Sequence, residues 1–487
     1  MKNKAIKLSI LGLLSLGVLF SCERELEQKS FSQIPLDEAM TSESNFSQAI
    51  NGAYSAIKGS GYFSVDTGNQ LIIPDLTTDN LIYNPEGRGS NFTAYNWSFS
   101  SNNSSVTGLF IQAYFVISRA NMPLKYINNL PMGNFRNNIE AHARAVRAAA
   151  HFDLVRAYCK IPTQSADANA SLGIPYITEF NPLENNTIRN LTVAQVYDNI
   201  ISDLNFAVNN ITDSSDKSKF SKAAIYGLLS RVYLYKGDYN NAVLAGNSSI
   251  SLSSSVGSIT NFPNIWSSNN TDGVLFKVLN SAQEAVTVGV AFQQGASPTG
   301  GNIRSEYVVP RSLNDLYIPT DIRKESYIRT SAYQGVQRNN VIKWAFNIAG
   351  ATPLNVVEVK YLRTAEVYLN VAEAAYKLGN EVLANTLLNN LKAQRYSAYL
   401  PSILTGTNLW NEIMLQRRLE LAFENDRYYT FKRLGLTMQR TGEGANINGT
   451  GTPSVIQTIL PNDTRWQWPI PQATINITPA FQQNPGY

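Results

Sequence analysis

The chain contains 487 residues, of which 44% are hydrophobic and 16% are charged. A chain of this length and composition can bury a large core, which excludes a wholly disordered or a collagen-like protein. The formal net charge is +4, and most of that excess comes from the N-terminus.

The first 21 residues are typical of a secretory signal peptide. Lys2, Lys4 and Lys7 precede an apolar stretch at 8–20, which is shorter than the ~20 residues that a membrane-spanning helix needs. Removal of residues 1–21 takes these three lysines from the 40 basic side chains and leaves 37 against 36 acidic ones. Such a nearly neutral mature chain is not expected to bind nucleic acid.

Cys22 follows Leu19, Phe20 and Ser21 in an arrangement that resembles the lipobox of bacterial lipoproteins. The resemblance implies that Cys22 is acylated, so that its lipid chains would anchor the protein in the outer membrane, facing the cell exterior. An ordinary signal peptide with an incidental cysteine is the alternative. Residues 22–40 would form an acidic tether, and their first part resembles the signals that send lipoproteins of Bacteroidetes-type bacteria to the cell surface.

Helical periodicity dominates the body of the chain. Apolar residues at spacings of three and four predict helices over 41–58, 105–250 and 355–435. The first stripes are Phe46, Ile50, Tyr54 and Ile57, then Phe110, Ala113, Ile117 and Ala120, and then Val193, Val196, Ile200, Leu204 and Val208. The alanine-rich stretch 141–158 allows close contact between helices, and Cys159 beside it is expected to be a buried, unpaired thiol.

Two segments carry the small-residue and aromatic spacing of tetratricopeptide helical hairpins. The first lies at 223–242, where Gly237 allows the turn, and the second lies at 365–391. Contiguous repeats of this kind recur about every 34 residues, whereas these two are more than about 100 residues apart. We therefore predict a mainly α fold with little β-structure, in which a tetratricopeptide-like helical-hairpin scaffold is interrupted by long insertions.

The two insertions, at about 60–105 and 251–355, are rich in Asn, Ser, Gly, Thr and aromatic residues. Their periodicity is broken, with short strand-like runs such as 286–290. Long irregular segments in a compact chain are usually functional, so we expect these to form loop-rich ligand-binding insertions. The Pro- and Gly-rich tail at 436–487 is predicted to cross the body as extended chain.

The chain lacks the common signatures of metal proteins and hydrolases. His142 and His151 are its only histidines, and nine residues along a helix place them on opposite faces, so they cannot share a metal ion. No zinc-hydrolase, phosphate-loop or serine-hydrolase motif is present. We expect no cofactor and no catalytic metal, and a structural calcium ion would have no readable motif here.

Several glutamates share helices with arginines, and we interpret them as helix-packing ion pairs rather than catalytic carboxylates. The glutamates are Glu366, Glu373, Glu412, Glu420 and Glu424, and the arginines are Arg363, Arg417, Arg418 and Arg427. The chain is accordingly predicted not to be an enzyme. A surface glycoside hydrolase stays the alternative from another class, because that chemistry needs only two suitably spaced carboxylates.

Several motifs together resemble the SusD/RagB family of surface nutrient-binding lipoproteins over nearly the whole chain. They are the lipobox with Cys22, the helix at 143–158, the hairpin at 223–242, the runs at 363–374 and 416–427, and the endings at 468–472 and 483–487. The resemblance implies one body over 41–487 that binds oligosaccharides or polysaccharides without cleaving them. It also implies delivery of that ligand to a SusC-like TonB-dependent transporter, with the helical face as the docking surface.

No family motif marks the ligand contacts, so we predict them from chemistry. Sugar rings stack their apolar faces on aromatic side chains, and their hydroxyls bind Asn, Asp and Arg. The candidates are Asp79, Arg88, Trp97 and Asn102 in the first insertion and Trp266, Tyr307, Tyr317 and Trp344 in the second. The near-neutral charge favours a neutral glycan, whereas a peptide ligand, as in RagB-like members, would favour charged or strand-edge contacts.

Overall fold

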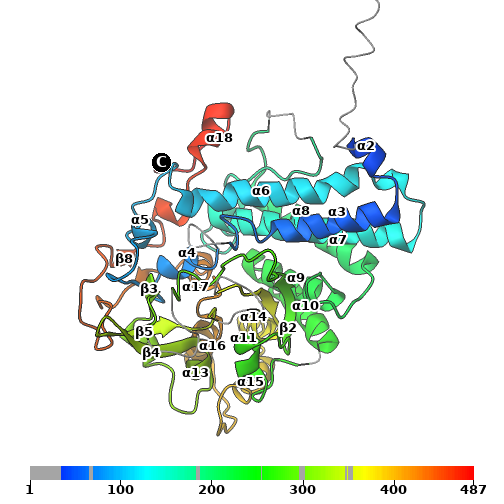
Figure 1. The fold of residues 1–487 in the computed structure, drawn as a ribbon. Helices are drawn as coiled ribbons and strands as arrows, with labels where there is room; N and C mark the ends of the chain where they lie inside the picture. The colour runs from blue at the N-terminus through cyan, green and yellow to red at the C-terminus, as the bar shows by residue number, and fades with distance from the viewer. Residues whose placement is uncertain are drawn as a thin grey trace, which may run out of the picture.

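Figure 1 shows the computed structural model, which describes residues 35–64, 70–181, 187–253, 255–294, 302–345, 348 and 355–487. The predicted signal segment, Cys22 and residues 23–34 of the predicted tether lie outside the described residues. Helices are the predominant regular structure, and several of the short strands lie at the lower left of the view.

The N-terminal helices pack together at the top of Figure 1. After the short α2 (Leu36–Ala39) they are α3 (Glu43–Ala56), α6 (Ser104–Lys125), α7 (Asn134–Tyr158) and α8 (Val193–Asn210). Three of these helices have N-cap side chains that accept hydrogen bonds from backbone N–H groups of the first turn: Ser42 for α3, Asn103 for α6 and Thr192 for α8. The alanine-rich α7 is buried along most of its length, because small side chains let the neighbouring helices approach closely.

A second helical group contains both predicted hairpins. They are α9 (Lys222–Lys236) with α10 (Tyr239–Leu252), and α14 (Thr364–Lys377) with α15 (Glu381–Lys392), followed by α16 (Gly406–Leu421). Gly237 turns the chain after α9 with a φ of 81°. Gly246 brings α10 against α14, where an added Cβ atom would lie 2.1 Å from Cγ2 of Val371. The two hairpins are therefore neighbours in space, which confirms the predicted interrupted helical array.

Both insertions contribute strands to one four-stranded antiparallel sheet, which the sequence pattern did not predict. The strand order is β1 (Ile82–Tyr83), β3 (Tyr307–Val308), β5 (Val336–Val341) and β4 (Ile328–Tyr333). Ile82 pairs with Val308, so the first insertion supplies an edge strand. The strand predicted at 286–290 is wrong, because those residues form irregular chain and turns. Its apolar residues serve packing instead, and Gly289 lies directly against the backbone of Trp344.

Short elements connect these parts. Two further ribbons pair β2 (Val274–Val278) with β6 (Val359–Arg363) and β7 (Met438–Gln439) with β8 (Thr458–Ile459). The short helices are α4 (Ile73–Leu76), α5 (Phe92–Tyr95), α11 (Phe262–Ser267), α12 (Arg311–Asn314), α13 (Arg323–Tyr327), α17 (Arg427–Arg433) and α18 (Gln472–Ile477). Three 3₁₀ turns lie at Ile127–Asn129, Ala168–Ala170 and Thr464–Trp466.

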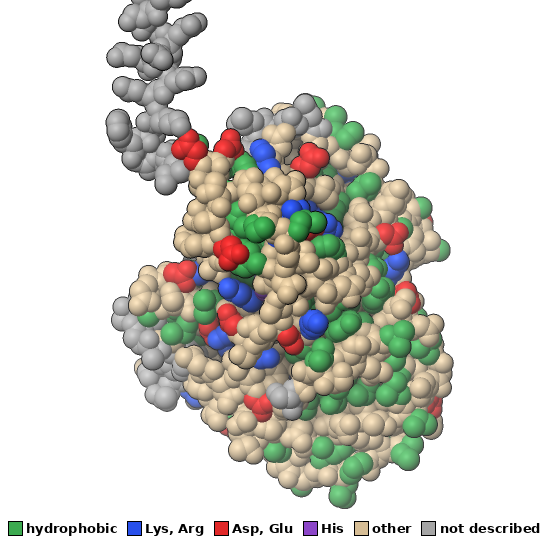
Figure 2. All heavy atoms as spheres, turned by 90° about the vertical axis from the view of Figure 1, so that its right-hand side faces the viewer, with side chains coloured by type: hydrophobic (Ala, Val, Ile, Leu, Met, Phe, Trp, Pro, Cys, Tyr) green, Lys and Arg blue, Asp and Glu red, His purple; other side chains and the backbone are tan. Residues whose placement is uncertain are grey.

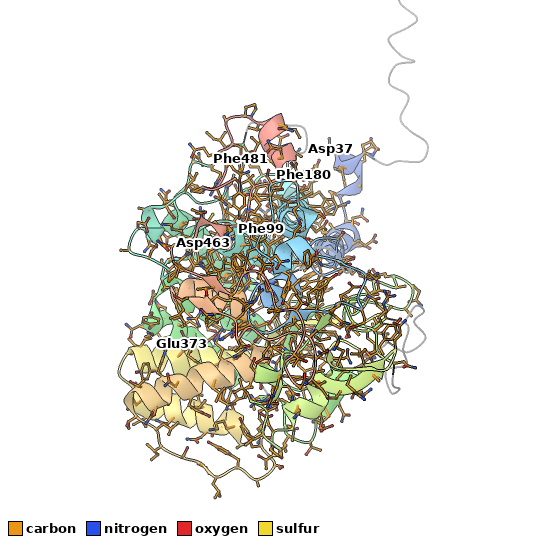
Figure 3. The ribbon with its side chains drawn as sticks, turned by 90° about the vertical axis from the view of Figure 1, so that its left-hand side faces the viewer. Asp37, Phe99, Phe180, Glu373, Asp463 and Phe481 are labelled. Carbon is orange, nitrogen blue, oxygen red and sulfur yellow. The ribbon has the colours of Figure 1, made fainter. Side chains whose placement is uncertain are left out.

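The C-terminal segment lies across the N-terminal helices. Trp468 donates its backbone N–H to the carbonyl of Ala157 at 3.1 Å, and the side-chain amide of Asn484 donates to the carbonyl of Tyr158 at 2.6 Å. Phe481, labelled at the top of Figure 3, belongs to the same segment. Cys159 at the end of α7 is fully buried and unpaired, as predicted.

Buried ion pairs hold α16 to the surrounding segments. Glu420 accepts from Arg363 at 2.7 Å and from Arg395 at 2.8 Å, and Arg363 also binds Glu424 at 2.5 Å. The remaining glutamates have partners too: Glu366 with Arg231, Glu373 with Arg433 and Glu412 with Lys392. The interpretation of these glutamates as ion-pair partners is thus confirmed.

Candidate functional site

The five aromatic residues predicted as stacking platforms lie in the core. Trp97, Trp266, Tyr307, Tyr317 and Trp344 each expose 3% or less of their surface, so none presents a ring face to a ligand in this structure. Trp97, Tyr317 and Trp344 each donate a hydrogen bond of 2.7 to 2.9 Å to a backbone carbonyl. This corrects the prediction: these five residues anchor the insertions in the core, and the polar atoms of Trp97, Tyr317 and Trp344 satisfy buried carbonyl groups.

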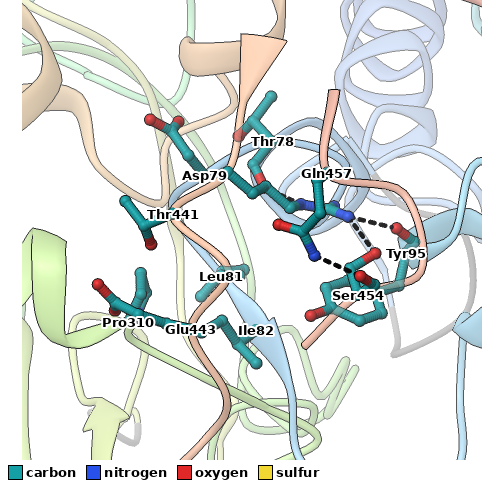
Figure 4. Close-up of a pocket in the computed structure, with 11 residues that line it drawn as sticks. Thr78, Asp79, Leu81, Ile82, Tyr95, Pro310, Thr441, Glu443, Ser454 and Gln457 are labelled. Carbon is teal, nitrogen blue, oxygen red and sulfur yellow. Dashed lines mark hydrogen bonds between the residues drawn. The ribbon is translucent and has the colours of Figure 1, made fainter. Parts of the chain in front are cut away.

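Asp79 is held in ion pairs rather than projecting toward a ligand. Nε and Nη2 of Arg427 each donate to its carboxylate at 2.8 Å, and Nη2 of Arg418 lies 3.1 Å away. Burial alone would raise the pKa of Asp79, but the two guanidinium groups lower it to about 2. Figure 4 shows Asp79 at the edge of a pocket of about 20 Å³, room for roughly one water molecule.

Arg440 lines the same pocket and was missed by the sequence reasoning. Its guanidinium donates to the carbonyl groups of Leu76 (2.9 Å), Thr78 (2.9 Å) and Tyr95 (3.0 Å). Burial lowers the pKa of Arg440 to about 10, so it stays charged at neutral pH. Arg440 therefore fastens the C-terminal segment to the first insertion. A single arginine in a Gly-rich tail belongs to no pattern that would have identified it.

The loop at 84–91, between β1 and α5, is organised around the buried carboxylate of Glu306. Arg88 donates to it from its backbone N at 2.8 Å and from Nε at 2.6 Å, and the amide of Gln294 donates at 2.5 Å. Burial alone would raise the pKa of Glu306, but these hydrogen bonds hold it below its usual value. Arg88 is fixed by this carboxylate, yet 39% of its side chain stays exposed.

Two aromatic rings flank the 84–91 loop and reach the surface. Phe92 is 51% exposed, and its ring stands edge-on to Tyr83 with 5.1 Å between ring centres. Tyr83 stacks in turn on Tyr95 at 6.1 Å. We call Tyr83, Arg88 and Phe92 the aromatic rim. Its two rings were not among the predicted residues, and the available signal was their position at either end of a loop that contains Arg88.

Neighbouring residues extend the surface around the rim. Arg304 donates to the carbonyl of Glu86 in the loop at 3.0 Å, and its guanidinium lies 5.9 Å from the ring centre of the half-buried Tyr333. Asn102 is exposed just before α6. The next residue, Asn103, donates to Thr93 of α5 at 2.5 Å, which keeps Asn102 beside α5. A ligand contact by Asn102 stays a prediction.

The histidines have packing roles. His142 binds the hydroxyl of Tyr54 at 2.8 Å, and His151 accepts from the backbone N–H of Ile177 at 3.0 Å. Within the described ranges, no three His, Cys, Asp or Glu side chains come together as a metal site would require. In that same part of the chain, every helix is too short or too polar to cross a membrane.

Two family models match the chain. Residues 26–234 match a SusD-like model described as starch-binding associating with outer membrane, and residues 354–487 match the model of the SusD family. SusD-like protein P38 of Formosa agariphila is 24% identical, and the alignment covers 100% of both chains.

Solved structures share the fold. A SusD superfamily protein from Bacteroides vulgatus is 25% identical and superposes with a TM-score of 0.78, which covers 92% of this chain and 99% of that one. Surface glycan-binding protein A from Bacteroides fluxus is 19% identical and has a TM-score of 0.72, covering 92% and 100% of the two chains. The two matching models, the full-length relative and the shared fold agree with the motifs of the sequence: this chain belongs to the SusD/RagB family.

Proposed function

We propose that this protein is a lipid-anchored receptor on the outer face of the outer membrane, which binds an oligosaccharide or polysaccharide and delivers it, uncleaved, to a SusC-like TonB-dependent transporter. Its family supports the proposal, because one matching model is described as starch-binding associating with outer membrane. The relative from B. fluxus is named as a surface glycan-binding protein. Cys22, which lies outside the described residues, would carry the anchor.

The aromatic rim is the observation that carries the glycan part of this proposal. A sugar residue has apolar C–H groups on its face and hydroxyls on its edge, so it binds where an exposed ring and a fixed polar group stand together. Phe92 exposes half of its surface, and the partly exposed Arg88 is held in place by Glu306. Groups that are already fixed lose little conformational entropy when a ligand binds.

An exposed apolar face supports the transporter part. Ile111 and Phe115 of α6 and Ile477 of α18 are 60%, 45% and 67% exposed, and a groove of about 310 Å³ lies between these two helices. Figure 1 shows α6 and α18 at the same end of the molecule as α2, the first described helix. Large exposed apolar side chains often mark an interaction site, and we propose that the transporter docks at this end of the molecule.

The test compares two phenylalanine variants of the soluble chain that starts after Cys22. A panel of plant, host and microbial polysaccharides first identifies the ligand, and Phe92→Ala should then weaken its binding at least about tenfold. Phe115→Ala removes a similarly exposed ring from another face and should leave the affinity unchanged. Equal affinities of the two variants would contradict a glycan site at the aromatic rim.

A further inference from the structure

A second pocket lies on a different face from the aromatic rim. It is bordered by α3, by β2 and by the segment 212–220 that links α8 to α9. Its volume is about 400 Å³, within the ~300–1,000 Å³ of small-molecule sites. In Figure 1, α3 and β2 lie to the right of α5, which stands at the left edge of the molecule. Figure 2 views the right-hand face and shows basic and acidic side chains intermixed on it.

Three lysines line this pocket, and two of them are already paired. Lys58 binds the carboxylate of Glu284, and Lys277 binds Glu358 at 2.6 Å. Lys219 is half-buried. Among the residues that the structure describes, the Lys219 ammonium group has no carboxylate within 4.0 Å and no hydrogen-bond acceptor. It is the cation of this pocket that is available to an incoming anion.

One further acidic side chain lines the pocket. Asp216 lies on the same segment as Lys219, and its Oδ1 accepts hydrogen bonds from the backbone N–H (2.9 Å) and the hydroxyl (2.7 Å) of Ser218. Burial alone would raise the pKa of Asp216, but the hydrogen bonds from Ser218 lower it, and the nearby positive charge of Lys219 lowers it further. Asp216 therefore balances part of the charge of Lys219 without occupying its hydrogen-bonding capacity.

Two largely buried aromatic rings and two exposed polar side chains also line the pocket. Tyr54 and Phe276 line it with 5.8 Å between their ring centres, but they expose only 8% and 1% of their surface, so they support the pocket from below rather than offer a ring face to a ligand. The Tyr54 hydroxyl is used inside the protein, where it accepts from the backbone N–H of Phe220 at 3.0 Å. Asn51 and Ser55 stand one turn apart on α3, and in the described part of the chain their side chains make no hydrogen bond.

We infer that this pocket binds a sugar residue that carries a carboxylate or a sulfate group. Lys219 forms a charge-assisted hydrogen bond with the oxyanion, and Asn51 and Ser55 bind hydroxyl groups of the sugar. The inference does not depend on the glycan site proposed above, because the two sites lie on different faces and share no residue.

Calorimetric titration of the soluble chain with three matched sugars tests the inference. D-Galacturonate and D-galactose 6-sulfate should both bind, and D-galactose should bind at least about tenfold more weakly. The stronger of the two acidic sugars identifies the preferred oxyanion. Lys219→Gln should weaken both at least about tenfold. Lys236→Gln changes a half-buried lysine outside the pocket, paired with Asp198, and should have no effect.

Three results would overturn the inference. The first is equal affinity for galactose and its acidic derivatives, and the second is unchanged affinity in Lys219→Gln. The third is binding of inorganic sulfate or acetate as tightly as the acidic sugars, because that would show a site for an oxyanion alone. Because Lys219 has no partner among the described residues, its variant should keep the wild-type thermal midpoint. Asn51→Ala is a second variant, which should weaken binding of the acidic sugars but not of inorganic sulfate.

Discussion

Replacement of Trp97 by alanine distinguishes a core residue from a ligand platform. Trp97 is 1% exposed and stands edge-on to Trp466 with 5.1 Å between ring centres. Loss of such a side chain costs about 3–5 kcal/mol. Its Nε1 also donates to the carbonyl of Thr77, and leaving that buried group unpaired costs about 1 kcal/mol more. We therefore expect Trp97→Ala to lower the free energy of unfolding by about 4–6 kcal/mol.

Urea unfolding followed by circular dichroism measures this loss, and Trp410→Ala is the matched control. Trp410 is half-buried and packs against Tyr376 with 5.2 Å between ring centres, so its removal should cost less than about 2 kcal/mol. A loss below about 2 kcal/mol in Trp97→Ala, together with abolished glycan binding, would refute the reasoning. It would mean that Trp97 turns outward to contact the ligand.

Three further substitutions test the frame around the site. Asp79→Asn should lower stability by about 2 kcal/mol at pH 7, because the pKa of about 2 lies below the usual 3.8. The stability difference between wild type and Asp79→Asn should disappear as the pH falls from about 4 to 2, because Asp79 then becomes protonated and loses its ion pairs. A difference that does not depend on pH would contradict the ion pairs. Burial lowers the pKa of His151 to about 3, so below pH 6.5 the unfolded chain takes up the proton first and stability falls. His151→Gln should flatten that decline by about 1.4 kcal/mol per pH unit, and an identical slope would contradict a buried neutral ring. Gly246→Ala should lower the free energy of unfolding by about 1–3 kcal/mol and with it the thermal midpoint. Gly52 has open space around it, so Gly52→Ala should not lower the midpoint. Equal midpoints of the two variants would disprove the close approach of α10 and α14.

The helical frame was predictable because its signals are local. Phe46 and Ile50, one turn apart, are both buried on α3, and Gly237 marks the turn between α9 and α10. The four-stranded sheet was not predictable in this way. Ile82 and Val308 pair across more than about 200 residues of sequence, and a strand of two residues carries no periodicity. Such pairing depends on tertiary contacts that no window of sequence contains.

The candidate site was only partly predictable for a related reason. Arg88 was predictable from its chemistry, and it does lie at the surface, because Glu306 holds the loop that carries it. Trp97 and Phe92 belong to the same Asn- and Ser-rich insertion, yet the first is buried and the second is half-exposed. Composition does not distinguish them. Trp97 is buried by contacts with the C-terminal segment, such as that with Trp466, which lies far away in the sequence.

Product analysis during ligand binding tests the central claim most directly. The wild-type soluble chain is incubated with each polysaccharide of the panel and with a mixed peptide pool, and the bound fraction and the chain length of the ligand are measured in the same samples. The account predicts saturable binding of one glycan class whose chain length does not change. Shortened sugar products would contradict it in favour of a glycoside hydrolase, and binding to peptides alone would contradict it in favour of peptide capture.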